Sequence, residues 1–143
     1  MAPRKLPFSR AVRAAERVTQ AQLGAGSANA WRNTALALWC FAWLPIAALS
    51  LGPAPAAPGS DKLHHFLVYG VMSFAALGFA RGARGLLTAA ATTLALGGLF
   101  ELLQTTVPGR SGEWADFGAD AVGALLGCAL ALLVLRRWPR PPA

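Results

Sequence analysis

The stretch GSDKLHHFLVYG, residues 59–70, begins with ionisable side chains and then runs into an almost purely apolar segment. Asp61, His65 and Tyr69 are spaced four residues apart, which places them on one face of a helix. Titratable groups are costly on a helix that enters a membrane, and they normally face the helix bundle and find partners there. We therefore predict that this helix contributes one wall of a polar site.

The composition of the whole chain indicates a membrane protein. Of the 143 residues, 55% are hydrophobic and 13% are charged, whereas a soluble domain carries about a quarter charged residues. Four apolar segments each have about the 17–25 residues that cross a hydrocarbon core as a helix. They cover roughly residues 34–51, 63–80, 86–104 and 117–135. The predicted fold class is all-α: a polytopic membrane protein with a four-transmembrane-helix bundle.

The placement of basic residues predicts the topology. The net charge is +7, and all of the 13 Lys and Arg residues except Lys62 and Arg110 lie in the N-terminal region, the RGARG loop or the C-terminal tail. Basic residues beside apolar runs follow the positive-inside rule, which explains them without a nucleic-acid partner. Both termini are therefore expected to be cytoplasmic.

Three regions follow from this pattern. They are a basic cytoplasmic N-terminal region (1–33), a four-helix transmembrane domain (34–136) and a short basic Pro-rich tail (137–143). The N-terminal region fits either a basic helix on anionic lipid or a disordered tail. A cleaved signal peptide that ends near APAAP is the rival interpretation of the first apolar run, but the basic region before that run is unusually long for one.

Ionisable residues from three predicted spans fall at one depth near the same face. His65, Glu101 and Asp120 each lie about 6 Å, one helical turn, inside the outer end of their segment. Glu101 follows an apolar run and caps no helix, so it indicates either a site or an obligatory buried pair. Asp61 and Asp116 also fit a simpler role as helix N-caps.

Small residues predict close packing among these segments. Gly97 and Gly98 lie in the third segment, and Gly123-x-x-x-Gly127 forms a small-residue stripe in the fourth. Such a stripe lets two helix backbones approach closely. We expect this packing to bring the polar side chains together.

Four motifs occur in a defined order along the chain: Asp61-Lys62-x-x-His65-Phe66-x-x-Tyr69, Glu101-x-x-Gln104, Pro108-Gly109-Arg110 and Asp116-x-x-x-Asp120-x-x-Gly123. Together they resemble the VanZ-like membrane protein family, over about residues 35–135. The family is named for a protein that confers low-level resistance to teicoplanin-type glycopeptides. The resemblance therefore implies an envelope role in a bacterial plasma (inner) membrane, without naming a reaction. One departure is Asp120, where the family usually has Asn, and this extra acid must be protonated or paired.

From the residues and the resemblance together we predict a set of ligand-binding residues: Asp61, Lys62, His65, Tyr69, Glu101, Gln104, Arg110, Asp116 and Asp120. The catalytic candidates are His65, Glu101 and Asp116, each suited to acid–base work, with Arg110 as an anion clamp. No metal is assigned, because no ligand spacing along the chain is diagnostic. The residues name no cofactor and do not determine the oligomeric state.

Two functions from different classes fit this set. The first is an accessory protein that binds a lipid-linked or cell-wall ligand from within the lipid bilayer, with a link to glycopeptide-type resistance. The alternative is a membrane enzyme that uses the Asp/His/Glu cluster for acid–base or metal-assisted chemistry on a lipid-linked envelope substrate. Unpaired acids in an open cluster would favour chemistry, whereas a closed cluster with every acid paired would favour a structural role.

Overall fold

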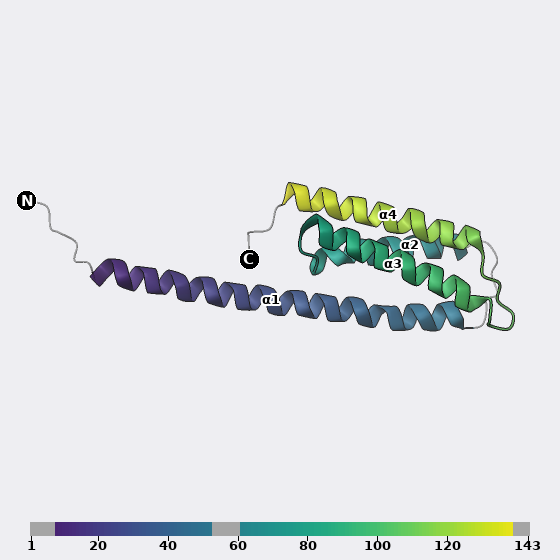
Figure 1. The fold of residues 1–143 in the computed structure, drawn as a ribbon, viewed down its shortest axis with the longest axis horizontal. Coiled ribbons are helices and arrows are strands. Elements are labelled where there is room, and N and C mark those ends of the chain that lie inside the picture. Colours follow the sequence, from purple (N-terminus) through teal and green to yellow (C-terminus); the bar gives the residue numbers. More distant parts are fainter. Residues whose placement is uncertain (1–7, 53–60, 139–143) are drawn as a thin grey trace, which may run out of the picture.

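The structure, a computed structural model, describes residues 8–52 and 61–138. Its helices are α1 (Phe8–Leu51), α2 (Asp61–Ala75), α3 (Gly82–Gln104) and α4 (Trp114–Arg137), with a 3-10 turn, η1 (Ala76–Gly78), after α2. These described residues contain no strand, which confirms the all-α expectation. Successive helices run in opposite directions, so that α1 and α3 end where α2 and α4 begin (Figure 1).

Helix α1 runs without a break from the basic N-terminal region into the first apolar segment. Every side chain from Val12 to Trp31 is exposed, and this part of α1 projects beyond the other helices (Figure 1). Arg32 marks the start of the packed part, because its Nε and Nη2 donate to the carbonyl oxygen of Phe79 at 3.1 and 2.7 Å. Residues 8–33 of the N-terminal region are therefore helical, whereas residues 1–7 lie outside the described ranges.

Three of the described helices are long and apolar enough to cross a membrane. The candidate spans are Val12–Leu51, Gly82–Gln104 and Trp114–Arg137. The prediction of a fourth span over residues 63–80 is wrong in this respect, because α2 has only 15 residues. Such a helix is about 22 Å long, whereas the hydrocarbon core is about 30 Å thick. Beyond α2 the chain tightens into η1 and reverses before α3, with Gly82 at a φ of 69°.

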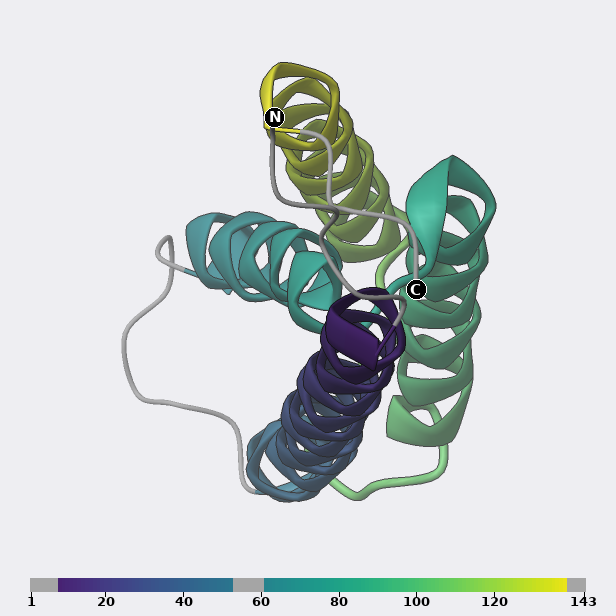
Figure 2. The ribbon, with the colours of Figure 1, turned by 90° about the vertical axis from the view of Figure 1, so that its left-hand side faces the viewer.

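Helices α2 and α4 pack backbone against backbone. A Cβ atom at Gly123 would collide with the carbonyl group of Phe66, and one at Gly127 would collide with that of Gly70. This contact confirms that the small-residue stripe of α4 permits close helix approach. Seen along the bundle, α1 lies on the side away from α4 (Figure 2).

Two tryptophans attach α1 to the other helices. Trp39 donates from Nε1 to the carbonyl oxygen of Met72 at 2.8 Å. Trp43 is buried, and its ring meets the Tyr69 ring edge-on with 5.8 Å between centroids. Tyr69 belongs to α2, the helix that carries Asp61 and His65, so this aromatic contact packs α1 against the helix with the polar motif.

The distribution of side chains is inverted relative to that of a soluble protein. Large apolar side chains such as Phe41, Leu102 and Leu125 are 66%, 66% and 62% exposed. The buried polar and charged residues are Ser73, Thr93, Glu101, Gln104, Asp116 and Asp120. Exposed apolar surface of this extent is stabilised by lipid and would aggregate in water. The described part of the chain is therefore a helical membrane protein whose interior combines apolar clusters with a group of buried polar side chains.

Candidate functional site

The polar side chains converge at one end of the bundle, where α3 ends and α2 and α4 begin (Figure 1). Helix α2 contributes Asp61 and His65 from its first two turns, and α4 contributes Asp116 and Asp120 from its own first two turns. Glu101 lies in the last turn of α3. Residues four apart on a helix share a face, so each helix presents its polar pair or single acid to the same space.

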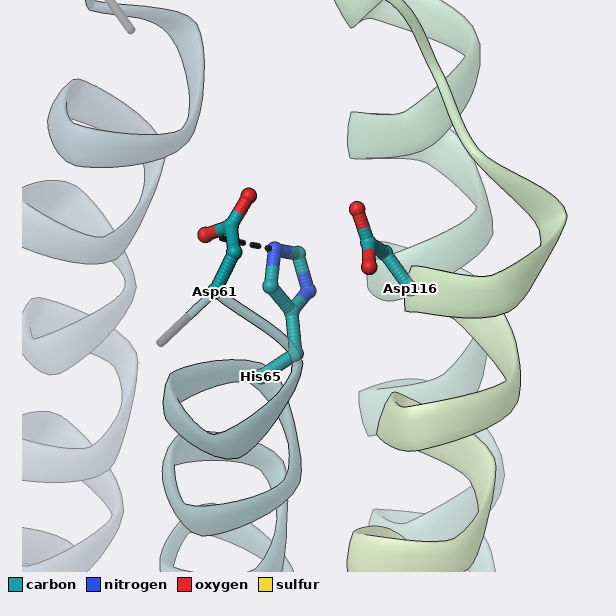
Figure 3. A group of neighbouring side chains, drawn as sticks. All are labelled: Asp61, His65 and Asp116. Atoms are coloured by element: carbon teal, nitrogen blue, oxygen red, sulfur yellow. Dashed lines mark ion pairs between the residues drawn. The ribbon is translucent and has the colours of Figure 1, made fainter. Parts of the chain in front are cut away.

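His65 is the centre of this cluster. Its Nδ1 lies 2.9 Å from Oδ1 of Asp120 and 3.9 Å from Oε1 of Glu101. Its Nε2 lies 3.8 Å from Oδ1 of Asp61. Figure 3 shows the imidazole between the carboxylates of Asp61 and Asp116, which belong to two different helices. A single imidazole thus faces acids from α2, α3 and α4.

Asp120 is fully buried, with an exposed fraction of 0%. One of its oxygens is paired with His65, whereas Oδ2 has no hydrogen-bond partner among the described residues. Space for this carboxylate comes from Gly97 on α3, since a Cβ there would lie 2.8 Å from both Asp120 Oδ2 and Tyr69 Cε1. The extra acid at position 120 is therefore paired through one of its two oxygens with the imidazole of His65.

Glu101 links the end of α3 to the start of α4. Its Oε2 accepts a hydrogen bond from the backbone N–H of Glu113 at 2.8 Å, just before α4 begins. Its Oε1 faces His65 and has no hydrogen-bond partner in the described part of the chain. One oxygen of Glu101 therefore binds the backbone before α4, and the other is available within the cluster.

Lys62 forms ion pairs with two acids, Asp116 of the cluster and the neighbouring Glu113. Its Nζ lies 2.9 Å from Oδ1 of Asp116 and 3.1 Å from Oε2 of Glu113. The hydrogen bond to Asp116, followed by that to Glu113, raises the pKa of Lys62 to about 12, so the amine stays charged at any physiological pH. Glu113 is absent from the predicted site residues; the only signal for it is its position as an acid directly before an apolar helix.

Gln104 and Arg110 hold the C-terminal end of α1. Gln104 donates from Nε2 to the carbonyl oxygen of Ser50 at 3.0 Å. Arg110 donates to the carbonyl oxygens of Gly52 and Leu49, both at 2.9 Å. The last carbonyl groups of a helix have no partner within the helix, so these two side chains satisfy them and attach α1 to the polar end. The role of Arg110 as an anion clamp stays a prediction.

Tyr69 lies one turn deeper than His65 on α2. The two rings are stacked, with 6.2 Å between centroids and 4° between planes. Tyr69 is 2% exposed, and its hydroxyl group has no hydrogen-bond partner among the residues described. The tyrosine therefore forms the floor of the cluster and adds an uncommitted polar atom to it.

The cluster has more acids than bases. Four carboxylates, of Asp61, Glu101, Asp116 and Asp120, lie around the imidazole of His65, and the ammonium group of Lys62 pairs with one of them, that of Asp116. Two sets of possible metal ligands meet at His65, namely Asp61/His65/Asp116 and His65/Glu101/Asp120, and within each set the ligand atoms lie within 4.8 Å of one another. Such an arrangement suits a cation or hydrogen-bond donors rather than a free anion.

The comparison with protein families can now be set beside this geometry. A model of the VanZ/LLP1 family matches residues 14–135 of the chain. The chain belongs to the VanZ/LLP1 family. This match confirms the resemblance that the four motifs indicated. No curated protein and no solved structure matched this VanZ-like chain.

Proposed function

We propose that this VanZ-like membrane protein binds a lipid-linked or cell-wall ligand at the polar end of its bundle, in an accessory role in the bacterial envelope. The observation that carries the proposal is the pair of buried carboxylate oxygens without a hydrogen-bond partner among the described residues, Glu101 Oε1 and Asp120 Oδ2. A buried acceptor without a partner costs about 1–3 kcal/mol, and more when it is charged. Two charged acceptors of this kind in one cluster favour a ligand that supplies the missing donors.

The chemistry of the cluster defines the part of the ligand that it holds. Because acids outnumber bases around His65, the site repels a bare phosphate or carboxylate and attracts hydroxyl or ammonium groups. Saccharide and peptide portions of envelope precursors carry such groups. We infer that the site recognises that portion, with the acyl chain of a lipid-linked ligand against the apolar outer faces of the helices.

The polar end is assigned to the extracytoplasmic face, with both termini cytoplasmic, in the plasma (inner) membrane. Arg81 and Arg84 lie at the start of α3, and Arg136 and Arg137 lie in the last turn of α4, so all four are at the opposite ends of these helices from the cluster. Basic residues near the ends of spans favour the cytoplasmic side. A ligand of the cell wall would meet the acids at the outer face.

Co-purification tests this function. The full chain is purified in native-lipid particles, and bound lipids and glycans are identified by mass spectrometry for the wild type, Glu101→Gln and a control at an exposed residue, His64→Gln. We expect one enriched envelope lipid or glycan in the wild type and control, and at least a tenfold loss in Glu101→Gln. Equal enrichment in Glu101→Gln, or none in the wild type, would contradict a ligand site at Glu101. Teicoplanin susceptibility of cells that express each version tests the resistance link separately.

One observation favours an enzyme as the second candidate. The 2.9 Å contact between His65 and Asp120 is the arrangement by which a carboxylate orients an imidazole as a general base. The described structure places no Ser or Cys side chain in contact with His65 among its hydrogen bonds and ion pairs, so a water or a substrate group would be the nucleophile. Incubation with total envelope lipids separates the two functions: a new product mass that depends on His65, but not on the exposed neighbour His64, indicates an enzyme.

A further inference from the structure

The buried half of the polar cluster has the donor atoms and the charge of a cation site. We propose that His65, Glu101 and Asp120 bind one divalent transition-metal cation. These residues come from α2, α3 and α4, so the site exists only when the three helices are packed. The metal site shares residues with the proposed ligand site. Its test needs only the protein and metal ions, so a negative result for the metal can be distinguished from a negative result for the envelope ligand.

The distances within this set match those around a bound metal. Ligand atoms at about 2.1 Å from a tetrahedral Zn²⁺ lie about 3.4 Å from one another. His65 Nδ1 lies 2.9 Å from Asp120 Oδ1 and 3.9 Å from Glu101 Oε1, so the two separations bracket that value. The third separation, between the carboxylate oxygens of Glu101 and Asp120, lies within 4.8 Å, and rotation of these side chains would complete the coordination.

The unpartnered oxygens are an independent reason to place a cation here. Glu101 is 8% exposed and Asp120 is 0% exposed, and each directs one oxygen into the cluster without a hydrogen-bond partner among the described residues. The ordinary charges of these two carboxylates beside one neutral imidazole sum to two negative charges, which a dication neutralises. A single proton would satisfy only one of the two acids.

The neighbouring set Asp61/His65/Asp116 is the weaker candidate. Asp116 already accepts a hydrogen bond from the ammonium group of Lys62 at 2.9 Å, so its negative charge is already paired with the positive charge of a lysine. Asp61 has a side chain that is 44% exposed and is therefore well solvated. Neither acid has the buried, partnerless oxygen that distinguishes Glu101 and Asp120.

The donor set selects the class of metal. One imidazole nitrogen with two carboxylates suits Zn²⁺ or Mn²⁺, whereas Ca²⁺ and Mg²⁺ prefer oxygen ligands throughout. Metal binding requires an unprotonated Nδ1 on His65, so affinity should fall as the pH is lowered and the imidazole takes up a second proton. Three protein ligands also leave a coordination position open for a further molecule.

Titration of the metal-free protein tests the site. The full chain in detergent is stripped with a chelator, and Zn²⁺ and Mg²⁺ are titrated in turn by calorimetry, with metal content measured by mass spectrometry. We expect one Zn²⁺ per chain and a Kd for Zn²⁺ at least tenfold lower than that for Mg²⁺. Asp120→Asn and Glu101→Gln should each weaken Zn²⁺ binding by more than about 100-fold, beyond the effect of losing an outer partner.

Matched variants keep the test specific. His64→Gln alters the exposed histidine beside His65, and Ser111→Ala alters an exposed loop side chain at the same end of the bundle; both should bind Zn²⁺ like the wild type. Absence of one-to-one Zn²⁺ binding by the wild type would overturn the site, whether or not the variants fold. Unchanged affinity in Asp120→Asn and Glu101→Gln, or an equal loss in His64→Gln, would overturn the assignment of the ligands.

Discussion

Asp120 Oδ1 and His65 Nδ1 lie 2.9 Å apart, although the two residues are 55 positions apart in the chain. The contact joins the second turn of α4 to the second turn of α2, next to the place where the backbones of these helices touch at Gly123 and Phe66. The hydrogen bond and the glycine contact therefore depend on each other: the imidazole reaches the carboxylate because nothing separates the two helices.

Substitution of Asp120 separates its hydrogen bond from its charge. Asp120→Asn keeps an oxygen that accepts from His65, so the melting temperature of the purified protein should stay within about 2 °C of the wild type. Asp120→Leu leaves the imidazole N–H buried without an acceptor and should lower the free energy of unfolding by about 1–3 kcal/mol. Thermal unfolding in detergent measures both. Equal melting temperatures for the two variants would show that the hydrogen bond contributes nothing to stability.

Glu101→Gln should fold normally and lose ligand binding. The amide oxygen of Gln can still accept from the backbone N–H of Glu113, and a neutral side chain is easier to bury than a carboxylate. We therefore expect accumulation in the membrane at or above the wild-type level. Glu101→Leu removes the acceptor as well and should cost about 1 kcal/mol, the size of a lost helix cap. Disappearance of Glu101→Gln from the membrane would instead identify a structural ion pair with His65.

The contact between α2 and α4 predicts a position-specific effect of a methyl group. Gly123→Ala places a Cβ against the carbonyl group of Phe66, and forced overpacking costs about 1–3 kcal/mol. Gly118→Ala, on the same helix, meets nothing within 4 Å and should leave stability unchanged or slightly higher because Ala favours helix. Thermal unfolding of the pair tests the packing, and similar stabilities would argue against the close approach.

The Lys62–Asp116 pair predicts a charge requirement. Lys62→Gln leaves the buried carboxylate of Asp116 without its cation and should reduce accumulation, whereas the double variant Lys62→Gln/Asp116→Asn should recover part of the loss. The pKa of Lys62 is raised from 10.5 to about 12 in the folded protein. The raised pKa of Lys62 therefore keeps the pair intact from neutral pH up to about pH 10, and the stabilisation is lost as the pH rises through about 12. Melting temperatures of the wild type and the double variant should thus differ by a constant amount from pH 7 to 9.

Thiol labelling tests the orientation. In a version without Cys40 and Cys128, Ser111→Cys lies in an exposed loop position at the polar end and Ala83→Cys is exposed at the other end. An impermeant thiol reagent added to intact cells should label the first and leave the second unlabelled until the cells are opened. The reverse pattern would place the polar end in the cytoplasm.

Much of the molecule could be predicted from the sequence because it depends on short-range patterns. Apolar segments of span length and the scarcity of charge identify a helical membrane protein, since lipid accepts long runs of apolar residues only as helices. The spacing of Asp61, His65 and Tyr69 places them on one face through helical geometry alone. Local patterns also favour acids in the first turns of α2 and α4, because carboxylates interact favourably with the positive end of the helix dipole. The N-cap role predicted for Asp116 is not seen, since α4 begins at Trp114 without a side-chain cap and Asp116 pairs with Lys62.

The partners in the site were decided by the tertiary structure. Nothing along the chain indicates that Arg110 binds carbonyl groups of α1 while Lys62 pairs with Asp116, because both are basic residues near the same face. The end of α2 could not be predicted from the apolar pattern either, because the apolar run continues through η1 whereas the α-helix ends at Ala75. Interactions within a few residues fix where helices form and which of their faces are polar, although not where α2 ends. Only the packing of α2 against α4 at Gly123 and Gly127 decided that His65 meets Asp120 and Glu101, because side-chain partners depend on how closely distant backbones approach.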